Sequence, residues 1–414
     1  MLKDNLITGL DIGSTAIRLV VGQQPKGDEK LKIIGAVEGS AQGISKGVVV
    51  SVEDAVSSVS AVIEKAERMI GQPVEHAWVG ISGSHIIAQE SRGVVAVSKT
   101  DGEIRQEDVE RVIEAARAVV TPPNYEILHV IPKNFTVDSQ IGIKDPIGMT
   151  GIRLEVETQI VQGLTSQIKN ITKSIYRTGL DIDDLVLSIL ATSESVLTNR
   201  QKELGVVIIN LGGSTTSLAV FEEGDVLHTA VLPIGSEYIT NDIAIGQRIS
   251  IDTAEKIKIR EGSCLPKNFK KHDEVKYTEV GGTEEGTFSR KKVAEIEEAR
   301  VEEIFYNIDK ELKKIGKSGM LPAGAVLTGR GAKLDGVVEV AKRSLRLPAS
   351  LGYPQELISN LDKVSDLSFT TAVGLVLWGS QLQQKGGRLH WPIFGSSIET
   401  SIAGIRNLIK KILP

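Results

Sequence analysis

Several features are absent from this 414-residue sequence, and each absence excludes a class of protein. Cys264 is the only cysteine, so no disulfide can form within one chain, which favours a reducing compartment. No apolar run reaches transmembrane length, and the N-terminus lacks the apolar stretch and cleavage site of a signal peptide. The net charge of −5 gives no reason to expect a nucleic-acid partner. We therefore expect a cytoplasmic protein.

The composition is that of an ordinary soluble globular protein, with 41% apolar and 24% charged residues. A chain of this length can form two domains, each with its own hydrophobic core. A repeated glycine pattern indicates that the two domains are related.

The most informative stretch, residues 206–224, reads V-V-I-I-N-L-G-G-S-T-T-S-L-A-V-F-E-E-G. Two apolar runs flank a glycine pair, which predicts strand, tight turn and strand. The turn leaves backbone N–H groups unshielded beside hydroxyls, as a phosphate site requires, at Gly212, Gly213, Ser214 and Thr215. Taken alone, such a turn is more often an ordinary connection between strands.

A second copy of this pattern lies near the N-terminus, where residues 6–22 read L-I-T-G-L-D-I-G-S-T-A-I-R-L-V-V-G. A shift of 199 positions places Asp11 on Asn210 and Gly13 on Gly212. Two such hairpins half a chain apart predict related domains that present glycine turns to a shared cleft. Ser14 and Thr15 would then join the phosphate site, and the Asp11 carboxylate could hold a hydrated Mg²⁺.

This hairpin pair resembles the phosphate-binding hairpins of the superfamily of actin, sugar kinases and DnaK-type chaperones. The resemblance implies a duplicated α/β fold of the actin/DnaK ATPase type, which clamps ATP between two domains. A third glycine turn resembles the adenosine motif of the superfamily, at Gly329, Arg330, Gly331 and Ala332. By the same resemblance, Gly235, Glu255 and Lys258 lie near the nucleotide, although exposed Glu–Lys pairs are also commonplace on helices.

Residues 86–161 predict a self-contained unit that interrupts the first domain. Its expected elements are a helix over Gln106–Val120 and two strands, Ile127–Ile131 and Phe135–Val137, on either side of Pro132. Three phrases in and beside this unit, G-I-S-G-S-H-I (80–86), H-V-I-P (129–132) and G-I-K-D-P-I-G-M (142–149), resemble the FtsA family of bacterial cell-division proteins. That family carries a subdomain called 1C at this point.

The resemblance divides the chain into subdomains and implies a function. Subdomain 1A would comprise residues 1–81 and 163–200, and the inserted subdomain 1C would comprise residues 82–162. Subdomain 2A would comprise residues 201–260 and subdomain 2B residues 261–320, and residues 321–380 would complete 2A and return to 1A. A linker (381–396) and a terminal helix (397–414) would follow. The implied protein binds ATP, self-associates, and tethers polymers of the tubulin-like protein FtsZ to the cytoplasmic face of the membrane. Subdomain 2B docks the C-terminal FtsZ peptide in this family, and Arg290 and Arg300 resemble its basic positions.

The predicted catalytic residues are Glu194 and Asn210. A strand expected over Val186–Ser193 leads to Glu194, which matches the family position that orients the attacking water; the alternative is a glutamate favoured by a helix N-terminus. Asn210 stands where the family normally has Asp, so Mg²⁺ should be held less firmly and hydrolysis should be slow at most.

Two further departures from the family pattern concern charge. Arg330 replaces a glycine, and Ala16 stands where lysine is frequent. Arg18 lies two residues beyond Ala16 on the same strand face and could supply the missing cation.

The C-terminal residues 397–413 predict an amphipathic helix. Its apolar side chains share an arc of about 140°, among them Ile398, Ile402, Ile405, Leu408, Ile409 and Ile412. At about 25 Å the helix is too short to span a bilayer but can lie in the interface on anionic lipid. The alternative is a helix that packs back onto the body.

Other functions remain open at this point. One is a pilus-assembly protein of the PilM family, and another is a sugar or acid kinase of the same superfamily. A third is a catalytically silent scaffold that binds nucleotide only as a structural ligand.

Overall fold

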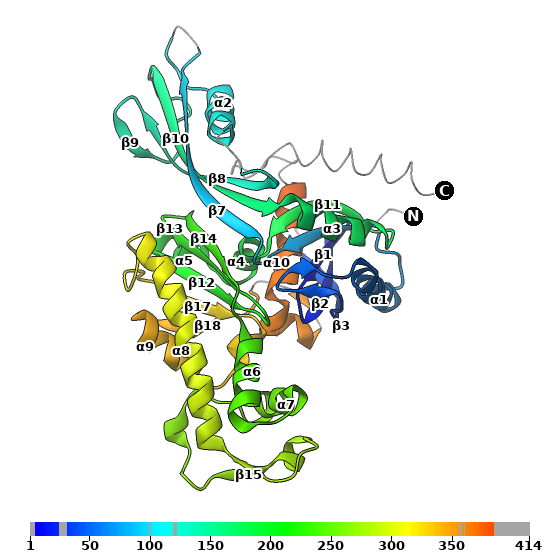
Figure 1. The fold of residues 1–414 in the computed structure, drawn as a ribbon. Helices are drawn as coiled ribbons and strands as arrows, with labels where there is room; N and C mark the ends of the chain where they lie inside the picture. The colour runs from blue at the N-terminus through cyan, green and yellow to red at the C-terminus, as the bar shows by residue number, and fades with distance from the viewer. Residues whose placement is uncertain are drawn as a thin grey trace.

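The computed structural model describes residues 5–24, 31–98, 101–118, 122–355, 358–359 and 361–384. Two sheet-containing domains lie side by side, and a third, smaller sheet projects beyond them (Figure 1). At the opposite end, a helical extension of the second domain carries α7 and β15 (Figure 1). The predicted terminal helix and most of the linker lie outside the described residues. Within the described part of the chain, no helix is long and apolar enough to cross a membrane.

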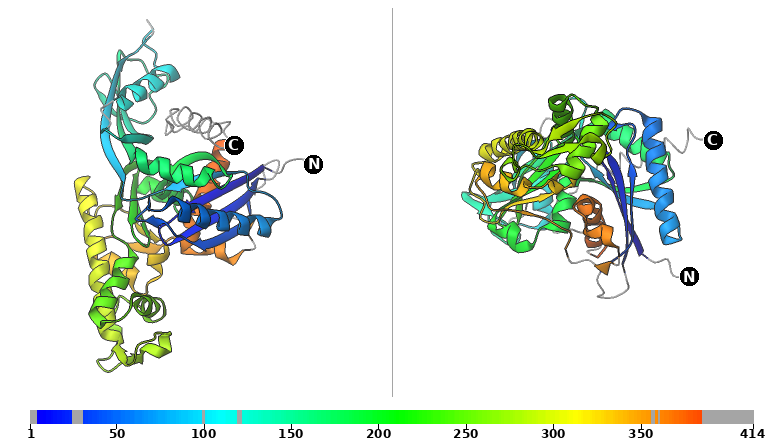
Figure 2. Two further views of the ribbon diagram at one scale, coloured as in Figure 1. Left: turned by 45° about the vertical axis from the view of Figure 1, so that its right-hand side comes forward. Right: turned by 90° about the horizontal axis from the view of Figure 1, so that it is seen from below.

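The first domain is a six-stranded sheet with helices on both faces. Its strand order is β11 (Asp181–Leu187), β6 (His76–Ile81), β1 (Asn5–Ile12), β2 (Ala16–Gln24), β3 (Lys32–Ser40) and β19 (Ile358–Ser359). α1 (Val52–Ile70) and α3 (Thr165–Tyr176) cover one face, while α4 (Ser188–Val196) and α10 (Thr370–Gln384) cover the other (Figure 2). A small ribbon, β4 (Ile44–Ser45) and β5 (Val48–Val49), follows β3.

The bounds of α1 agree with its sequence signals. Ser51 caps the first turn by accepting a hydrogen bond from the Asp54 N–H, and Gly71 ends the helix at a φ of 74°. Both residues are of the types that favour these positions. Local sequence signals therefore fix both ends of α1.

The second domain has a five-stranded sheet of the same general plan. Its order is β14 (Asp225–Leu232), β13 (Thr216–Glu222), β12 (Val206–Leu211), β17 (Gly324–Thr328) and β18 (Ala349–Leu351). The second domain also has the helices α5 (Asn199–Leu204), α6 (Ser236–Gln247), α7 (Ile251–Glu261), α8 (Arg290–Lys314) and α9 (Val337–Leu345). Its smaller elements are the ribbon β15 (Glu274–Lys276) and β16 (Thr287–Ser289) and the 3₁₀ turns η1 (Pro266–Asn268), η2 (Tyr277–Val280) and η3 (Arg330–Lys333). Two further 3₁₀ turns, η4 (Asp362–Ser365) and η5 (Leu367–Phe369), lead to α10 and pack against it.

The two predicted hairpins are confirmed, and they share one register. Ile12 pairs with Ile17 in the first, and Leu211 pairs with Thr216 in the second. A shift of 199 positions superposes these pairs, as it superposes the glycines. The repeat seen in the sequence is therefore a repeat of backbone pairing.

The inserted subdomain is a four-stranded sheet with one helix against it. Its order is β7 (Ile86–Ala96), β10 (Arg153–Leu164), β8 (Tyr125–Val137) and β9 (Gln140–Ile143), and α2 (Gln106–Arg117) packs on β7 and β10. The prediction of two strands around Pro132 is wrong, because β8 is continuous. Pro132 lies opposite Thr158, next to a shift in register, where the missing N–H costs the ladder least.

Two other predictions of secondary structure are also wrong. The strand expected over Val186–Ser193 is the end of β11 followed by α4. Eight of the nine α4 residues are buried, so its sequence shows no polar face from which a helix could be recognised. The linker was expected from Gln381, but α10 continues to Gln384.

Candidate functional site

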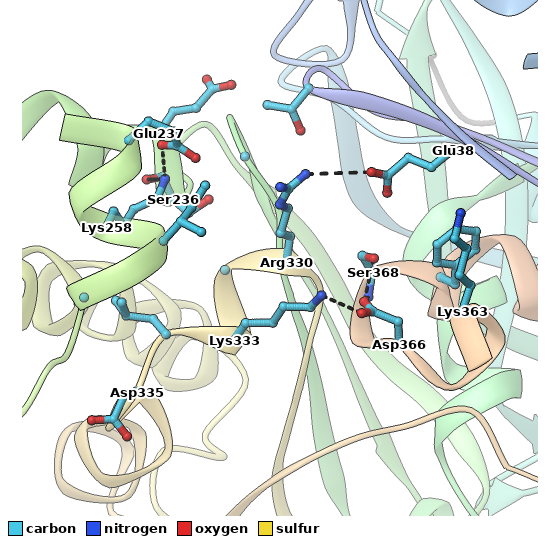
Figure 3. Close-up of a pocket in the computed structure, with 18 residues that line it drawn as sticks. Glu38, Ser236, Glu237, Lys258, Arg330, Lys333, Asp335, Lys363, Asp366 and Ser368 are labelled. Carbon is cyan, nitrogen blue, oxygen red and sulfur yellow. Dashed lines mark hydrogen bonds and ion pairs between the residues drawn. The ribbon is translucent and has the colours of Figure 1, made fainter. Parts of the chain in front are cut away.

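A cleft between the two domains contains two adjoining cavities. The smaller, of about 90 Å³, lies between the hairpin turns, and the larger, of about 750 Å³, extends toward α6, α7 and η3. Figure 3 shows the residues that line the larger cavity. Four residues line both cavities: Thr15, Gly213, Arg330 and Ser368. A ligand that fills the cleft would therefore pass these four residues.

The structure brings most of the predicted phosphate ligands to the smaller cavity. Its lining includes Asp11, Gly13, Ser14, Thr15, Arg18, Asn210, Gly212, Gly213, Ser214, Thr215, Gly329 and Arg330. Each turn is closed by one backbone bond, from Gly13 N to the Ala16 oxygen at 3.1 Å and from Gly212 N to the Thr215 oxygen at 3.0 Å. A Cβ on either glycine would lie 2.7 or 2.6 Å from that oxygen, so only glycine fits.

The second turn is held in place by the start of α6. The Ser236 and Glu237 N–H groups donate to the Gly212 and Gly213 oxygens at 2.9 and 2.8 Å. The predicted Gly235 lines neither cavity, but a Cβ there would collide with the Gly213 oxygen. Gly235 therefore acts on the site by permitting this close approach.

The first hairpin carries the charged groups of the smaller cavity. Burial raises the pKa of Asp11 to about 6, against the opposing effect of the Arg18 guanidinium. Arg18 is 7% exposed, donates from Nε to Glu38 at 2.8 Å, and has Nη1 4.0 Å from the Asp11 carboxylate. Its Nη2 has no partner among the described residues. A buried guanidinium nitrogen without an acceptor, beside a cavity, indicates an anion site.

Asn210 is the neutral counterpart of Asp11. Its Nδ2 donates to the Thr371 hydroxyl at 3.2 Å. This hydrogen bond joins β12 to α10, and both residues line the smaller cavity. Within the described residues, no group of three or more His, Cys, Asp or Glu side chains could hold a metal ion. Among the described residues that line the smaller cavity, Asp11 is the one carboxylate.

The larger cavity contains the predicted Glu255 and Lys258 on α7. Their side chains form an ion pair at 2.5 Å, and the Thr240 hydroxyl bonds to both. Burial alone would raise the pKa of Glu255, but Lys258 and Thr240 lower it overall, so the carboxylate is ionised at neutral pH. The pair is thus a fixed feature of the cavity wall.

The third glycine turn lies at the boundary of the two cavities. Gly329 has a φ of 85°, and a Cβ there would collide with the Asn210 side chain, so only glycine fits. Gly331 lines the larger cavity, whereas the predicted Ala332 is buried and lines neither.

Glu194 is not at the cleft. It lies on α4, where its carboxylate accepts from Lys202 Nζ at 2.7 Å and from Gln381 Nε2 at 3.3 Å. It is absent from the lining of both cavities. The placement of Glu194 beside the nucleotide depended on the strand predicted before it, and the helix found there turns its side chain elsewhere.

The two predicted FtsZ-binding arginines both have intramolecular partners. Arg290 pairs with Glu261 at 3.0 Å and lies over the Phe269 ring. Arg300 binds Asp242 through two bonds of 2.5 and 2.9 Å. A peptide carboxylate would compete with these partners.

Several residues of the cleft escaped the sequence analysis. Thr371, Ser188 and Ser82 line the smaller cavity, and Glu38, Glu237 and the Lys333–Asp366 ion pair line the larger one (Figure 3). They lie singly on different elements, without a recurring spacing. For Glu38, the position opposite Arg18 depends on the register between β2 and β3, which shifts between Val21 and Gly22 and is not fixed by the sequence.

Comparison with known proteins identifies the family. The model described as "Cell division protein FtsA" matches residues 207–374, and the "SHS2 domain inserted in FTSA" matches residues 83–162. Cell division protein FtsA of Pseudomonas aeruginosa is 38% identical over 392 residues, or 95% of this chain and 93% of the relative.

Solved structures support the fold. The chain matches the PilM-PilN type IV pilus biogenesis complex with a TM-score of 0.66 and 15% identity, over 90% of this chain and 98% of that one. It matches MreB5 of Spiroplasma citri bound to ADP with a TM-score of 0.53 and 12% identity, over 93% of this chain and 99% of that one. The architecture is therefore the actin-like ATPase fold with an inserted SHS2 domain, and the chain belongs to the FtsA family of cell division proteins.

Proposed function

We propose that the protein binds ATP with Mg²⁺ in the interdomain cleft, self-associates, and tethers FtsZ polymers to the cytoplasmic face of the membrane. The observation that carries the nucleotide site is the pair of glycine turns around a cavity that also contains the unpartnered Arg18 Nη2. The ADP-bound MreB5 structure, which shares this fold, supports a nucleotide as the ligand.

The residues present fit a nucleotide with a hydrated metal ion. Phosphate oxygens would satisfy Arg18 Nη2 and the turn N–H groups. Mg²⁺ usually keeps several waters and binds one or two carboxylates together with the phosphates, a role that the Asp11 carboxylate would fill here. The metal would neutralise charge that develops on the phosphates during hydrolysis. Asn210 adds no negative charge near the metal, so hydrolysis is slow.

Calorimetry with ATP and Mg²⁺ tests the nucleotide site. We expect saturable ATP binding below millimolar concentrations, and weaker binding when the metal is chelated. No binding near millimolar nucleotide would contradict the proposal.

The tethering role rests on family membership and on the amphipathic tail sequence. Insertion of one tail is weak, because burying an aliphatic side chain gives at most about 1.5–3 kcal/mol while ordering the backbone costs about 1–2 kcal/mol per residue. Tails aligned on a filament would raise the apparent affinity about a hundredfold or more. Membrane binding should therefore depend on self-association.

Co-sedimentation with anionic vesicles, FtsZ and ATP tests this role. Ile405→Glu with Ile409→Glu should release the protein and FtsZ from vesicles without changing ATP binding. Thr400→Glu with Asn407→Glu makes the same charge change on the polar face and should retain most binding. If both pairs behave alike, or wild type ignores vesicles at every concentration, the tail is no membrane anchor.

Docking of FtsZ is tested separately with its C-terminal peptide by fluorescence anisotropy. Arg290→Ala and Arg300→Ala should weaken peptide binding, while Lys292→Ala on the exposed side of α8 serves as the control. Equal peptide affinity of all three variants would show that Arg290 and Arg300 do not contribute to FtsZ binding. A pilus-assembly role is less well supported, because the PilM-PilN similarity is limited to 15% identity.

A further inference from the structure

Arg330 occupies an unusual place in the cleft. It is the first residue of η3, in the glycine turn that ends β17, and its side chain lines both cavities. Figure 3 shows the guanidinium extending across the cleft from the second domain toward Glu38 of the first. Half of the side chain is exposed, at 51%. A flexible cation therefore lies at the boundary between the phosphate end and the other end of the cleft.

Arg330 is held more weakly than the neighbouring cations. Lys258 and Lys333, which line the larger cavity, have ion pairs of 2.5 and 2.6 Å. Within the described part of the chain, the one ion pair of Arg330 joins Nη1 to Glu38 at 3.9 Å. Such an exposed, long pair contributes about 0–1 kcal/mol. Glu38 also accepts the shorter 2.8 Å bond from Arg18, so it does not depend on Arg330 for a partner.

These contacts form a row of alternating charge that crosses the cleft. Asp11, Arg18 and Glu38 belong to the first domain, and Arg330 is the single member from the second. Two cationic groups of this row line the smaller cavity and can still bind an anion. They are Nη2 of Arg18, which has no partner among the described residues, and the weakly paired guanidinium of Arg330. An anion placed between the hairpin turns would lie within the field of both.

We propose that Arg330 is a phosphate ligand that exchanges Glu38 for the polyphosphate of a bound nucleotide, and so reports nucleotide occupancy across the two domains. This inference rests on the proposed nucleotide site. A nucleotide whose terminal phosphates lie between the hairpin turns and whose nucleoside fills the larger cavity must pass Arg330. A planar guanidinium binds phosphate through two parallel bonds, which are stronger than one long contact with an exposed carboxylate.

The exchange has a consequence for the relation of the two domains. Without nucleotide, the Arg330–Glu38 pair is a direct link between η3 and β3. With nucleotide, Arg330 and the second turn bind the same phosphate chain that Arg18 and the first turn bind, so the ligand replaces the direct link. Arg330 thereby supplies from the second domain a cation that its own hairpin lacks, since Ser217 occupies the position equivalent to Arg18.

Calorimetry of the full-length protein with ATP and, separately, adenosine tests this inference. Arg330→Gln should weaken ATP binding about 10- to 100-fold, as expected for loss of a charge-assisted bond, and leave adenosine binding unchanged. Glu38→Gln should tighten ATP binding a few-fold in the presence of Arg330, and this gain should be smaller in the double variant, where only Arg18 loses its ion pair with Glu38. Arg343→Gln, which removes a charge on α9 outside both cavities, is the matched control.

The outcomes separate the possible failures. Equal or tighter ATP binding by Arg330→Gln would overturn the inference, since Arg330 would then only obstruct the cleft. Equal weakening of ATP and adenosine would also overturn it, because the effect would not involve phosphate. If wild type binds neither ligand, the proposed nucleotide site itself fails. Thermal unfolding of each variant ensures that folded protein is compared.

Discussion

The two hairpins have the same backbone but different chemistry. Their registers coincide, and their closing hydrogen bonds of 3.1 and 3.0 Å occupy equivalent positions. Asp11 pairs with Arg18 across the first hairpin, whereas Asn210 pairs with Ser217 across the second. The comparison shows that turn geometry and charge are separable. Glycine is fixed by steric contact in both copies, while the strand positions beside it can differ.

The difference assigns separate tasks to the two halves of the cleft. In the proposed nucleotide site, the first hairpin would offer a carboxylate to the metal and a buried cation to phosphate. The second offers backbone N–H groups, hydroxyls and an amide that bonds to Thr371. The second domain contributes cations from other elements, at Lys258, Arg330 and Lys333.

The largest effect is expected from filling the contact between the two turns. A Cβ at Gly213 would lie 2.6 Å from Cγ2 of Thr15, so Gly213→Val should push the turns apart and weaken ATP binding by more than about 100-fold. Gly213→Ala should weaken it less. Addition of Thr15→Ser should restore part of the affinity of Gly213→Ala, as measured by calorimetry. No recovery would show that the contact with Thr15 is not the cause.

Exchange of the acidic and amide residues tests the division of tasks. Asp11→Asn makes both hairpins neutral at this position and should reduce Mg²⁺-dependent ATP turnover about 100-fold, because the metal loses its carboxylate. Asn210→Asp should raise turnover about tenfold by adding one. Phosphate release with and without chelator measures both effects. If Asn210→Asp lowers turnover while ATP still binds, the amide is not what limits hydrolysis.

Stability should depend on pH through a buried carboxyl of the second domain. Glu297 on α8 is fully buried, accepts from Ser263 N at 2.7 Å, and leaves Oε1 without a partner among the described residues. Burial raises its pKa from 4.5 to about 8, against opposing effects of the Ser263 N–H and Lys258. The folded state then holds a proton that the unfolded state releases, so stability falls as pH rises from about 4.5 to about 8.

Glu297→Gln removes this part of the pH dependence. The amide keeps an acceptor for Ser263 and adds a donor at the unpartnered position. The melting temperature should therefore rise relative to wild type at pH 9, by the equivalent of up to about a few kcal/mol, and rise less at pH 5. Equal shifts at the two pH values would mean that ionisation of Glu297 does not couple to unfolding.

The smallest effect is expected at Glu194. Since its carboxylate pairs with Lys202 outside both cavities, Glu194→Ala should leave ATP turnover within about twofold of wild type and lower stability by about 1 kcal/mol. Lys202→Ala should match the stability loss, and the double variant should lose little more. A large loss of turnover with unchanged melting temperature would show that Glu194 takes part in catalysis.

Local signals explain what could be predicted from the sequence. The hairpins carry glycine turns between apolar runs, and α2 follows a periodic pattern; both hairpins were predicted, and α2 begins at the predicted Gln106. By contrast, α4 is buried on nearly all sides, so burial removed the pattern that identifies a helix. The Arg330–Glu38 contact joins distant parts of the chain, and only the packing of two domains determines it.

The packing of α10 on β1 sets the order in which the chain can fold. Gly9 of β1 lies so close to the Ala372 backbone that a side chain would collide with it, and α10 also packs on α4. A ribosome makes β1 first and α10 after the whole second domain, which has a hydrophobic cluster of its own. One face of β1 therefore stays uncovered until α10, the last described helix, has been synthesised. Final packing of the first sheet is thus a late step of synthesis from the N-terminus.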